Sequence, residues 1–251
     1  MSRSIFFKTD AGVSGDMFVG SLIALGVPLE TLEESVGRLG LEGISLRAEN
    51  VRRAGVEAVK FSVLEAGTGE DIEVAKGEQP HRGLSDIIEI IKRGSFSPSV
   101  EEAAISIFRK LAEAESRVHQ VPVEELHFHE VGALDSIVDV LCASVGLNWL
   151  EVEECHCLPP VLGAGEVVCA HGVIAVPAPA TLEILSGRPF RNPRFETPPG
   201  ELTTPTGAAL LDHFCKEFSA PPLFTPESEG FGAGGRELDF PNILRATMGT
   251  I

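Results

Sequence analysis

Short strand patterns alternate with helix patterns along this chain, and no other feature of the sequence constrains the fold as much. An apolar strand pattern at residues 5–7 precedes a helix pattern over 16–25. Residues 44–53 and 56–64 alternate in polarity on either side of a two-residue turn, which predicts a β-hairpin. We therefore expect an α/β or α+β fold in which a mixed sheet has flanking helices.

The spacing of apolar residues and the positions of turn-forming residues predict the remaining helices and strands in the same way. A proline at the first helical position predicts helices that begin at Pro177 and Pro205. The expected helices cover 28–39, 84–92, 99–119, 133–150, 177–185 and 205–218, and the expected strands lie within 151–176 and near 223–227 and 242–248. The glycine-rich segment 230–235 is expected to be a turn. We expect one region over 1–251 with a soft boundary near 150, between a half with the metal motif (1–150) and a half rich in strands and turns (151–251).

Charge and cysteine content exclude several functions. The chain has 20 Lys and Arg against 37 Asp and Glu, a net charge of −17, which disfavours binding to nucleic acid and to acidic membrane surfaces. No signal peptide or membrane-spanning run is visible. Five cysteines without a leader predict a cytoplasmic protein without a disulfide framework. Cys155-His156-Cys157 has no second cysteine pair at zinc-finger spacing, so packing is favoured over metal binding.

The segment 127–139 carries the strongest chemical motif. In an extended chain His127 and His129 point to one face, and in a helix Asp135 and Asp139 share a face, with Glu130 at the junction. Imidazole and carboxylate together suit nickel, manganese, iron, cobalt or zinc. The sequence therefore predicts a metal site, and general acid–base catalysis without a metal is the alternative.

A second motif lies in the turn between the first strand and the first helix. Ser14 and Gly15 stand at the expected helix start, where backbone N–H groups favour a phosphate, and Ser14 is the expected cap. Asp10 and Asp16 are candidate catalytic carboxylates, or would hold a cation. No Gly-Lys-Ser/Thr follows, so this is not a Walker A loop.

Two further segments run into proline-started helices. Thr203, Thr204 and Thr206 surround Pro205 and offer hydroxyls beside free backbone N–H groups, which suits a phosphate or carboxylate. Ala170-His171-Gly172 leads toward Pro177 in a similar way. Helix caps beside turns explain both segments equally well.

The order and spacing of five motifs resemble the LarC-type nickel-insertion proteins, in their N-terminal part. The motifs lie at 9–17, 123–139, 170–181, 201–208 and 230–245, so the resemblance covers nearly the whole chain. It implies insertion of nickel into a pyridinium bis-thiocarboxylic acid mononucleotide, which yields the nickel-pincer nucleotide. The reaction is a CTP-dependent cyclometallation in the lyase class. Within this interpretation we expect nickel to bind at the 127–139 motif, and the phosphate of the nucleotide to bind at Ser14, Gly15 and the threonines.

The resemblance also implies partners that this chain would need. CTP with Mn²⁺ or Mg²⁺ belongs to a C-terminal domain in the full-length family, and we expect that domain to be absent here or to be a separate chain. Family members often carry a histidine-rich run where this chain has only Gln79-Pro80-His81-Arg82, which disfavours a nickel reservoir. Homo-oligomerisation is left open. The alternatives are a metal-binding scaffold subunit without catalysis, and a metal-independent hydrolase that uses His and carboxylates.

Overall fold

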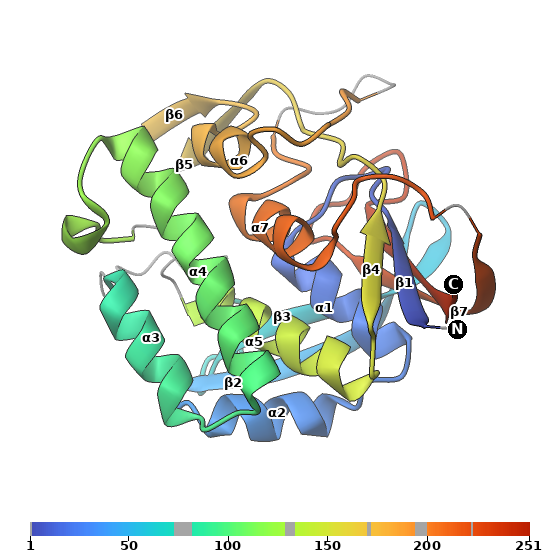
Figure 1. Cartoon of the computed structure of the whole chain (residues 1–251), viewed down its shortest axis with the longest axis horizontal. Coiled ribbons are helices and arrows are strands. Elements are labelled where there is room, and N and C mark those ends of the chain that lie inside the picture. The colour runs from blue at the N-terminus through green and yellow to red at the C-terminus, as the bar shows by residue number, and fades with distance from the viewer. Residues whose placement is uncertain (1, 73–81, 129–133, 170–171, 194–199, 222) are drawn as a thin grey trace.

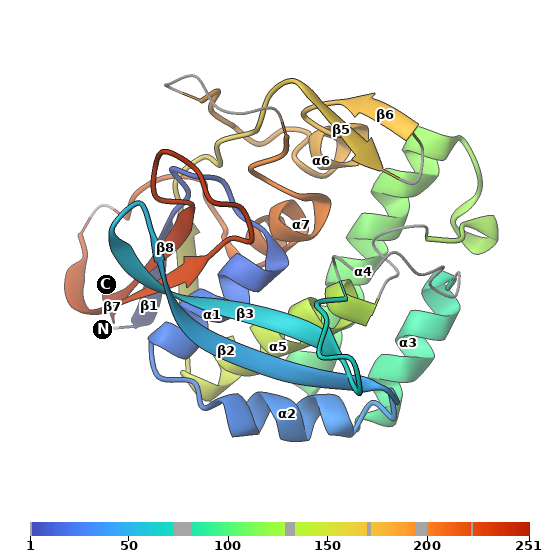
Figure 2. The ribbon, with the colours of Figure 1, turned by 180° about the vertical axis from the view of Figure 1, so that it is seen from behind.

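The first and last strands of the chain pair with each other inside a six-stranded sheet (Figures 1 and 2). A computed structural model describes residues 2–72, 82–128, 134–169, 172–193, 200–221 and 223–251. The sheet has the order β2-β3-β7-β8-β1-β4, in which β1–β4 and β3–β7 are parallel and the other pairs antiparallel. Its strands are β1 (Arg3–Lys8), β2 (Ile44–Arg53), β3 (Val56–Glu65), β4 (Glu154–Cys157), β7 (Thr225–Ala233) and β8 (Ile243–Thr250). The expected mixed sheet is confirmed, and strands from before and after residue 150 share it.

Helices cover one face of this sheet in successive layers. They are α1 (Gly15–Ala24), α2 (Leu29–Gly37), α3 (Leu84–Arg93), α4 (Pro98–His119), α5 (Leu134–Trp149), α6 (Pro179–Ile184) and α7 (Pro205–Phe214), with a 3₁₀ turn at Val123–Glu125. Helix α1 lies directly against β3, β7 and β8, α5 packs on α1, and α4 packs on α5 (Figure 1). The small hairpin of β5 (Glu166–Cys169) and β6 (Gly172–Ala175) lies apart from the main sheet, beside α6.

Aromatic rings join the sheet to the helices at the centre of the core. Phe7 on β1 lies with its ring centroid 4.6 Å from that of Phe18 on α1, and Phe18 in turn stacks on Phe214 of α7 at 6.1 Å. Both Phe7 and Phe18 are fully buried. Burial of such large apolar side chains is the main force that holds α1 between the sheet and the other helices.

The β2–β3 hairpin forms as the sequence predicts. Its turn residues Ala54 and Gly55 both have positive φ, 45° and 86°. Two left-handed residues make the tight turn whose twist matches that of paired strands. The alternating polarity of both strands then places one face of the hairpin against the core.

The prediction of a turn over 230–235 is wrong, because β7 continues to Ala233. A Cβ added to Gly232 would lie 2.6 Å from the backbone nitrogen of Ser21 and 2.8 Å from the carbonyl carbon of Met17. Real Cβ atoms essentially never come within 3.0 Å of another heavy atom. The missing side chain therefore lets the α1 backbone lie on the strand, and this tertiary packing overrides the turn preference of glycine.

Two predicted helix boundaries also differ from the structure. Helix α6 begins at Pro179 and not at Pro177, because a residue that precedes a proline is pushed out of the helical region, and Ala178 accordingly has φ −59° and ψ 143°. Helix α7 begins at Pro205 as predicted but ends at Phe214. Cys215 is extended there and forms a β-bridge with Cys155, so the sheet edge ends the helix.

Candidate functional site

The starts of α1, α5 and α7 lie together. The loop before α1 is joined to the loop before α7, since Val13 donates to the Leu202 carbonyl at 2.9 Å and accepts from the Thr204 N–H at 3.0 Å. The hydroxyl of Thr206 on α7 lies 3.5 Å from that of Ser136 on α5. Helix N-termini carry unpaired N–H groups and a partial positive charge. Their convergence would favour an anionic ligand at this point.

Two glycines allow the three helices to approach so closely. A Cβ on Gly15 would lie 2.7 Å from the Cβ of Asp139, and a Cβ on Gly207 would lie 3.0 Å from the Cα of Ser14. The first separation is closer than real Cβ contacts, and the second is tighter than nine in ten of them. The buried carboxylate of Asp139 is thus held against the start of α1, and motifs far apart in the sequence form one site.

Asp135, in the first turn of α5, contributes a solvent-shielded carboxylate oxygen. Its Oδ1 has no hydrogen-bond partner among the described residues. Burial raises the pKa of Asp135, the backbone N–H groups of Ser136 and of Asp135 itself oppose the shift, and the carboxylates of Asp71 and Asp16 add to it. A buried carboxylate oxygen without a partner is costly, and such groups concentrate where a cation or a proton is bound.

Asp16 is held from two sides. Its Oδ1 accepts a hydrogen bond from the Ser14 hydroxyl, and its Oδ2 lies 2.6 Å from the ammonium of Lys60 on β3. Ser14 occupies the N-cap position of α1, as predicted, but its hydroxyl bonds Asp16 and makes no cap hydrogen bond. Sequence reasoning missed Lys60. A lysine within an apolar strand is a weak signal, and nothing in the sequence pairs it with a residue 44 positions earlier.

Other predicted residues make structural contacts. Asp10 is exposed and pairs with Arg191 at 2.8 Å. The hydroxyl of Thr203 donates to the Val161 carbonyl at 2.8 Å. The hydroxyl of Thr204 caps α7 by accepting from the Gly207 N–H at 3.2 Å. These contacts shape the loops around the site, and the catalytic or ligand roles expected of the three residues stay predictions.

The histidine motif is described only in part. His127 is exposed, and the following Phe128 is buried and donates its N–H to the Arg82 carbonyl at 3.0 Å. His129, Glu130 and His171 lie outside the described residues. Within the described ranges, no three His, Cys, Asp or Glu side chains form a group that could hold a metal ion. The predicted ligand set is therefore represented here by His127, Asp135 and Asp139, which do not form such a group by themselves.

The cysteines of the Cys155-His156-Cys157 segment pack in the core. Both are buried free thiols near Cys215, which is also buried and free. Burial, followed by the neighbouring Cys157, raises the pKa of Cys155 to about 12. A thiol binds metal as the thiolate, so the raised pKa of Cys155 favours the packing interpretation that the spacing suggested.

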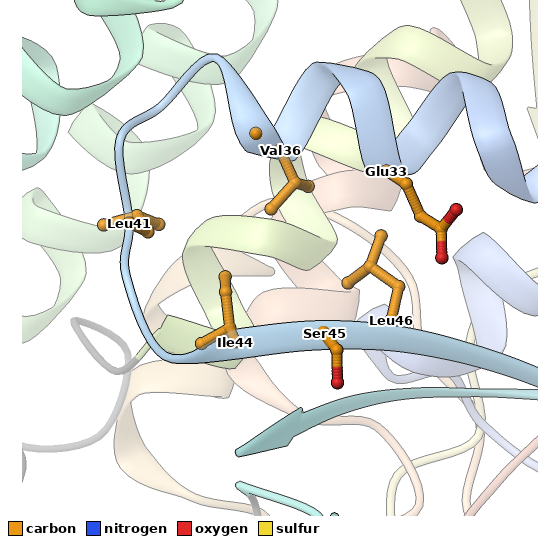
Figure 3. Close-up of a pocket in the computed structure, with 7 residues that line it drawn as sticks. Glu33, Val36, Leu41, Ile44, Ser45 and Leu46 are labelled. Carbon is orange, nitrogen blue, oxygen red and sulfur yellow. The ribbon is translucent and has the colours of Figure 1, made fainter. Parts of the chain in front are cut away.

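A pocket between α2 and β2 lies apart from this site (Figure 3). It is lined by apolar side chains that include Val36, Leu41, Ile44 and Leu46, with the Glu33 carboxylate at one side. None of the residues that the sequence predicted as catalytic or ligand-binding lines it. The chemistry of the chain therefore points to the helix starts and not to this pocket.

Comparison with known proteins settles the family. A sequence profile described as "Nickel insertion protein" matches residues 5–250. The chain belongs to the nickel insertion protein family. A family member from Geobacter sp. (strain M21) is 42% identical over 245 residues, which cover 97% of this chain and 60% of the relative. No solved structure matches the chain.

Two more members of the nickel insertion family carry a specific name. The proteins of Geobacillus kaustophilus (strain HTA426) and Desulfitobacterium hafniense (strain DSM 10664 / DCB-2) are each named "Pyridinium-3,5-bisthiocarboxylic acid mononucleotide nickel insertion protein". They are 42% and 39% identical, over 98% and 99% of this chain. The chain spans only about 60% of the length of these nickel insertion proteins. The resemblance expected from the motifs is confirmed at the level of the family.

Proposed function

We propose that this chain binds nickel and presents it to a pyridinium bis-thiocarboxylic acid mononucleotide, as part of a CTP-dependent cyclometallation that makes the nickel-pincer nucleotide. Family membership and the names of two relatives support the substrate. The observation that carries the proposal is the shielded Oδ1 of Asp135, which has no hydrogen-bond partner among the described residues. A cation at that point would supply the partner that this oxygen lacks.

The proposed nickel ligands combine imidazoles and carboxylates. Asp135 is the central ligand, and Asp139 on the same face of α5 binds the metal or orients a ligand. His127, His129 and Glu130 complete the set. This mixture of nitrogen and oxygen donors suits nickel better than hard cations such as magnesium.

The nucleotide phosphate is proposed to lie at the starts of α1 and α7. Backbone N–H groups near Gly15 and the hydroxyls of Ser14 and Thr206 would bind its oxygens, while Thr203 and Thr204 hold the loop in shape. A chain with a net charge of −17 needs such local positive dipoles to hold a phosphate.

The remaining components are proposed to lie elsewhere. CTP, with Mg²⁺ or Mn²⁺, would be held by a domain or a separate chain outside the matched region. The reaction would take place in the cytoplasm, in agreement with the free thiols of the four cysteines whose side chains are described. Among the described residues, no helix is long and apolar enough to cross a membrane.

Calorimetric titration with nickel chloride tests the proposal. We compare the wild type with Asp135→Asn, and use Glu57→Gln as the control, because Glu57 is an exposed carboxylate on β3 and its replacement changes the net charge equally. Replacement of residues that only orient metal ligands typically lowers metal affinity by about 10- to 100-fold. Loss of a direct ligand should therefore weaken nickel binding at least tenfold. The control should bind like the wild type. Equal affinities for Asp135→Asn and Glu57→Gln, or no binding by the wild type, would refute the proposed site.

A further inference from the structure

A buried ion pair joins β3 to the start of α1. The Lys60 ammonium lies 2.6 Å from Asp16 Oδ2, and the two side chains are only 12% and 14% exposed. The same ammonium donates to the Phe61 carbonyl at 2.9 Å. Since Ser14 donates to the other oxygen of Asp16, both oxygens of this carboxylate are engaged.

Stability alone is a poor explanation of this pair. Burying two charges costs desolvation free energy that their attraction often only just offsets, and an apolar pair of similar volume is frequently no less stable. The pair lies near Asp139, because Gly15 directly precedes Asp16 and a Cβ on Gly15 would lie 2.7 Å from the Cβ of Asp139. A positive charge is therefore fixed near one of the carboxylates that are proposed to bind the metal ion.

We propose that Lys60 is a resident counter-ion of the metal site, which nickel must displace from Asp16, so that bound nickel is held weakly enough to be released. This inference rests on the proposed function and names what regulates the same site. The ammonium and the metal ion compete for the negative potential of Asp16. A charge within about 4–6 Å changes the proton affinity of a carboxylate about 10- to 1000-fold, and a divalent ion should respond at least as strongly.

A protein that hands its metal to a substrate needs this property. Carboxylates and imidazoles bind nickel more tightly than manganese, iron or cobalt, and a competing positive charge would lower this affinity. A lysine that returns to Asp16 as the metal departs replaces the lost partner, so that the carboxylate is never left buried and uncompensated. Lys60 is thus a positioning and affinity-setting residue, and it need not touch the nucleotide.

Nickel affinity and release test the inference. Lys60→Gln removes the charge and keeps a hydrogen-bond donor for Asp16, Lys60→Arg keeps the charge, and Lys92→Met removes an exposed lysine on α3 as the control. We expect Lys60→Gln to bind nickel chloride about tenfold more tightly in calorimetry. It should also release nickel correspondingly more slowly to a chelator in stopped flow, while the other two variants behave like the wild type. Unchanged or weaker binding by folded Lys60→Gln would overturn the inference.

A second comparison keeps the test decisive if Lys60→Gln does not fold. Asp16→Asn and Asp16→Asn/Lys60→Gln should bind nickel with the same affinity, because Lys60 acts through the charge of Asp16. Tighter binding by the double variant would overturn the inference. The two proposals fail in different ways. If the wild type binds nickel and Asp135→Asn does not, but charge at position 60 has no effect, the metal site stands and the counter-ion role is wrong. If the wild type binds no nickel, both fall.

Discussion

The close contact between α1 and β7 makes Gly232 the position where the smallest change should have the largest structural effect. In Gly232→Ala, the new methyl would meet backbone atoms of Met17 and Ser21, which cannot rotate away as a side chain can. Gly235 is the matched control, since its added Cβ would meet only the Lys60 Cε, at 4.0 Å. Both residues belong to the same glycine-rich segment, so the comparison isolates the packing of α1.

The magnitude follows from two opposing effects. Forcing a methyl into a packed core costs about 1–3 kcal/mol, and contact with backbone on the helix side favours the upper end. Alanine recovers about 0.5–1 kcal/mol that glycine loses in a strand. We therefore expect Gly232→Ala to lower the free energy of unfolding by about 2 kcal/mol, or roughly 4–8 °C in melting temperature for a chain of this length. Gly235→Ala should stay within about 0.5 kcal/mol of the wild type.

Urea unfolding followed by circular dichroism measures both variants. If the two substitutions changed stability equally, or if Gly235→Ala were the more harmful, the glycine-rich segment would have some role other than admitting α1. Phosphate binding, a common role of glycine-rich loops, would then be the alternative to test.

Two further predictions concern the helix starts. Because the pKa of Asp135 is raised in the folded protein, this residue contributes stability that is fully present below the ordinary carboxyl pKa and is lost as the pH rises through the folded value. The free energy of unfolding of the wild type relative to Asp135→Asn, measured with urea at pH 4 and pH 7, should therefore fall as the pH rises. A difference that does not depend on pH would contradict the burial argument. Thr204→Ala removes the hydroxyl that caps the Gly207 N–H, and it should lower the free energy of unfolding by about 1 kcal/mol. Thr204→Ser keeps a hydroxyl and should retain most of that stability. Equal losses in thermal melts would show that the hydroxyl is not the cause.

Local patterns were sufficient to predict much of the fold. The β2–β3 hairpin, the start of α7 at Pro205 and the mixed sheet with helices all follow from period, turn chemistry and proline position. The errors arose where a distant contact decides the local structure. Segment 230–235 has the composition of a turn, yet the closeness of α1 extends the strand to Ala233, and pairing with Cys155 ends α7 early.

For the candidate site, too, local patterns indicated single residues, whereas the contacts between distant segments could not be predicted. The sequence offered Ser14, Asp135 and Thr206 as separate candidates, each with an ordinary explanation as part of a helix start. Only the fold shows that these helix starts meet, and that Lys60 reaches Asp16. No spacing rule connects a strand lysine to an aspartate in the first turn of a distant helix, so such a partner is invisible without the tertiary arrangement.

The pairing of β1 with β8 has a consequence for how the protein is made. Strand β1 emerges first from the ribosome, but its neighbours in the sheet are β4 and β8, which follow roughly 150 and 240 residues later. Contacts of such long sequence separation form slowly, because a large loop must close before they are made. Ser14 and the first turn of α1, which carries Asp16, therefore stay unanchored on one side until β8 is synthesised. A chain still under synthesis would have the carboxylates of the proposed nickel site but not their arrangement.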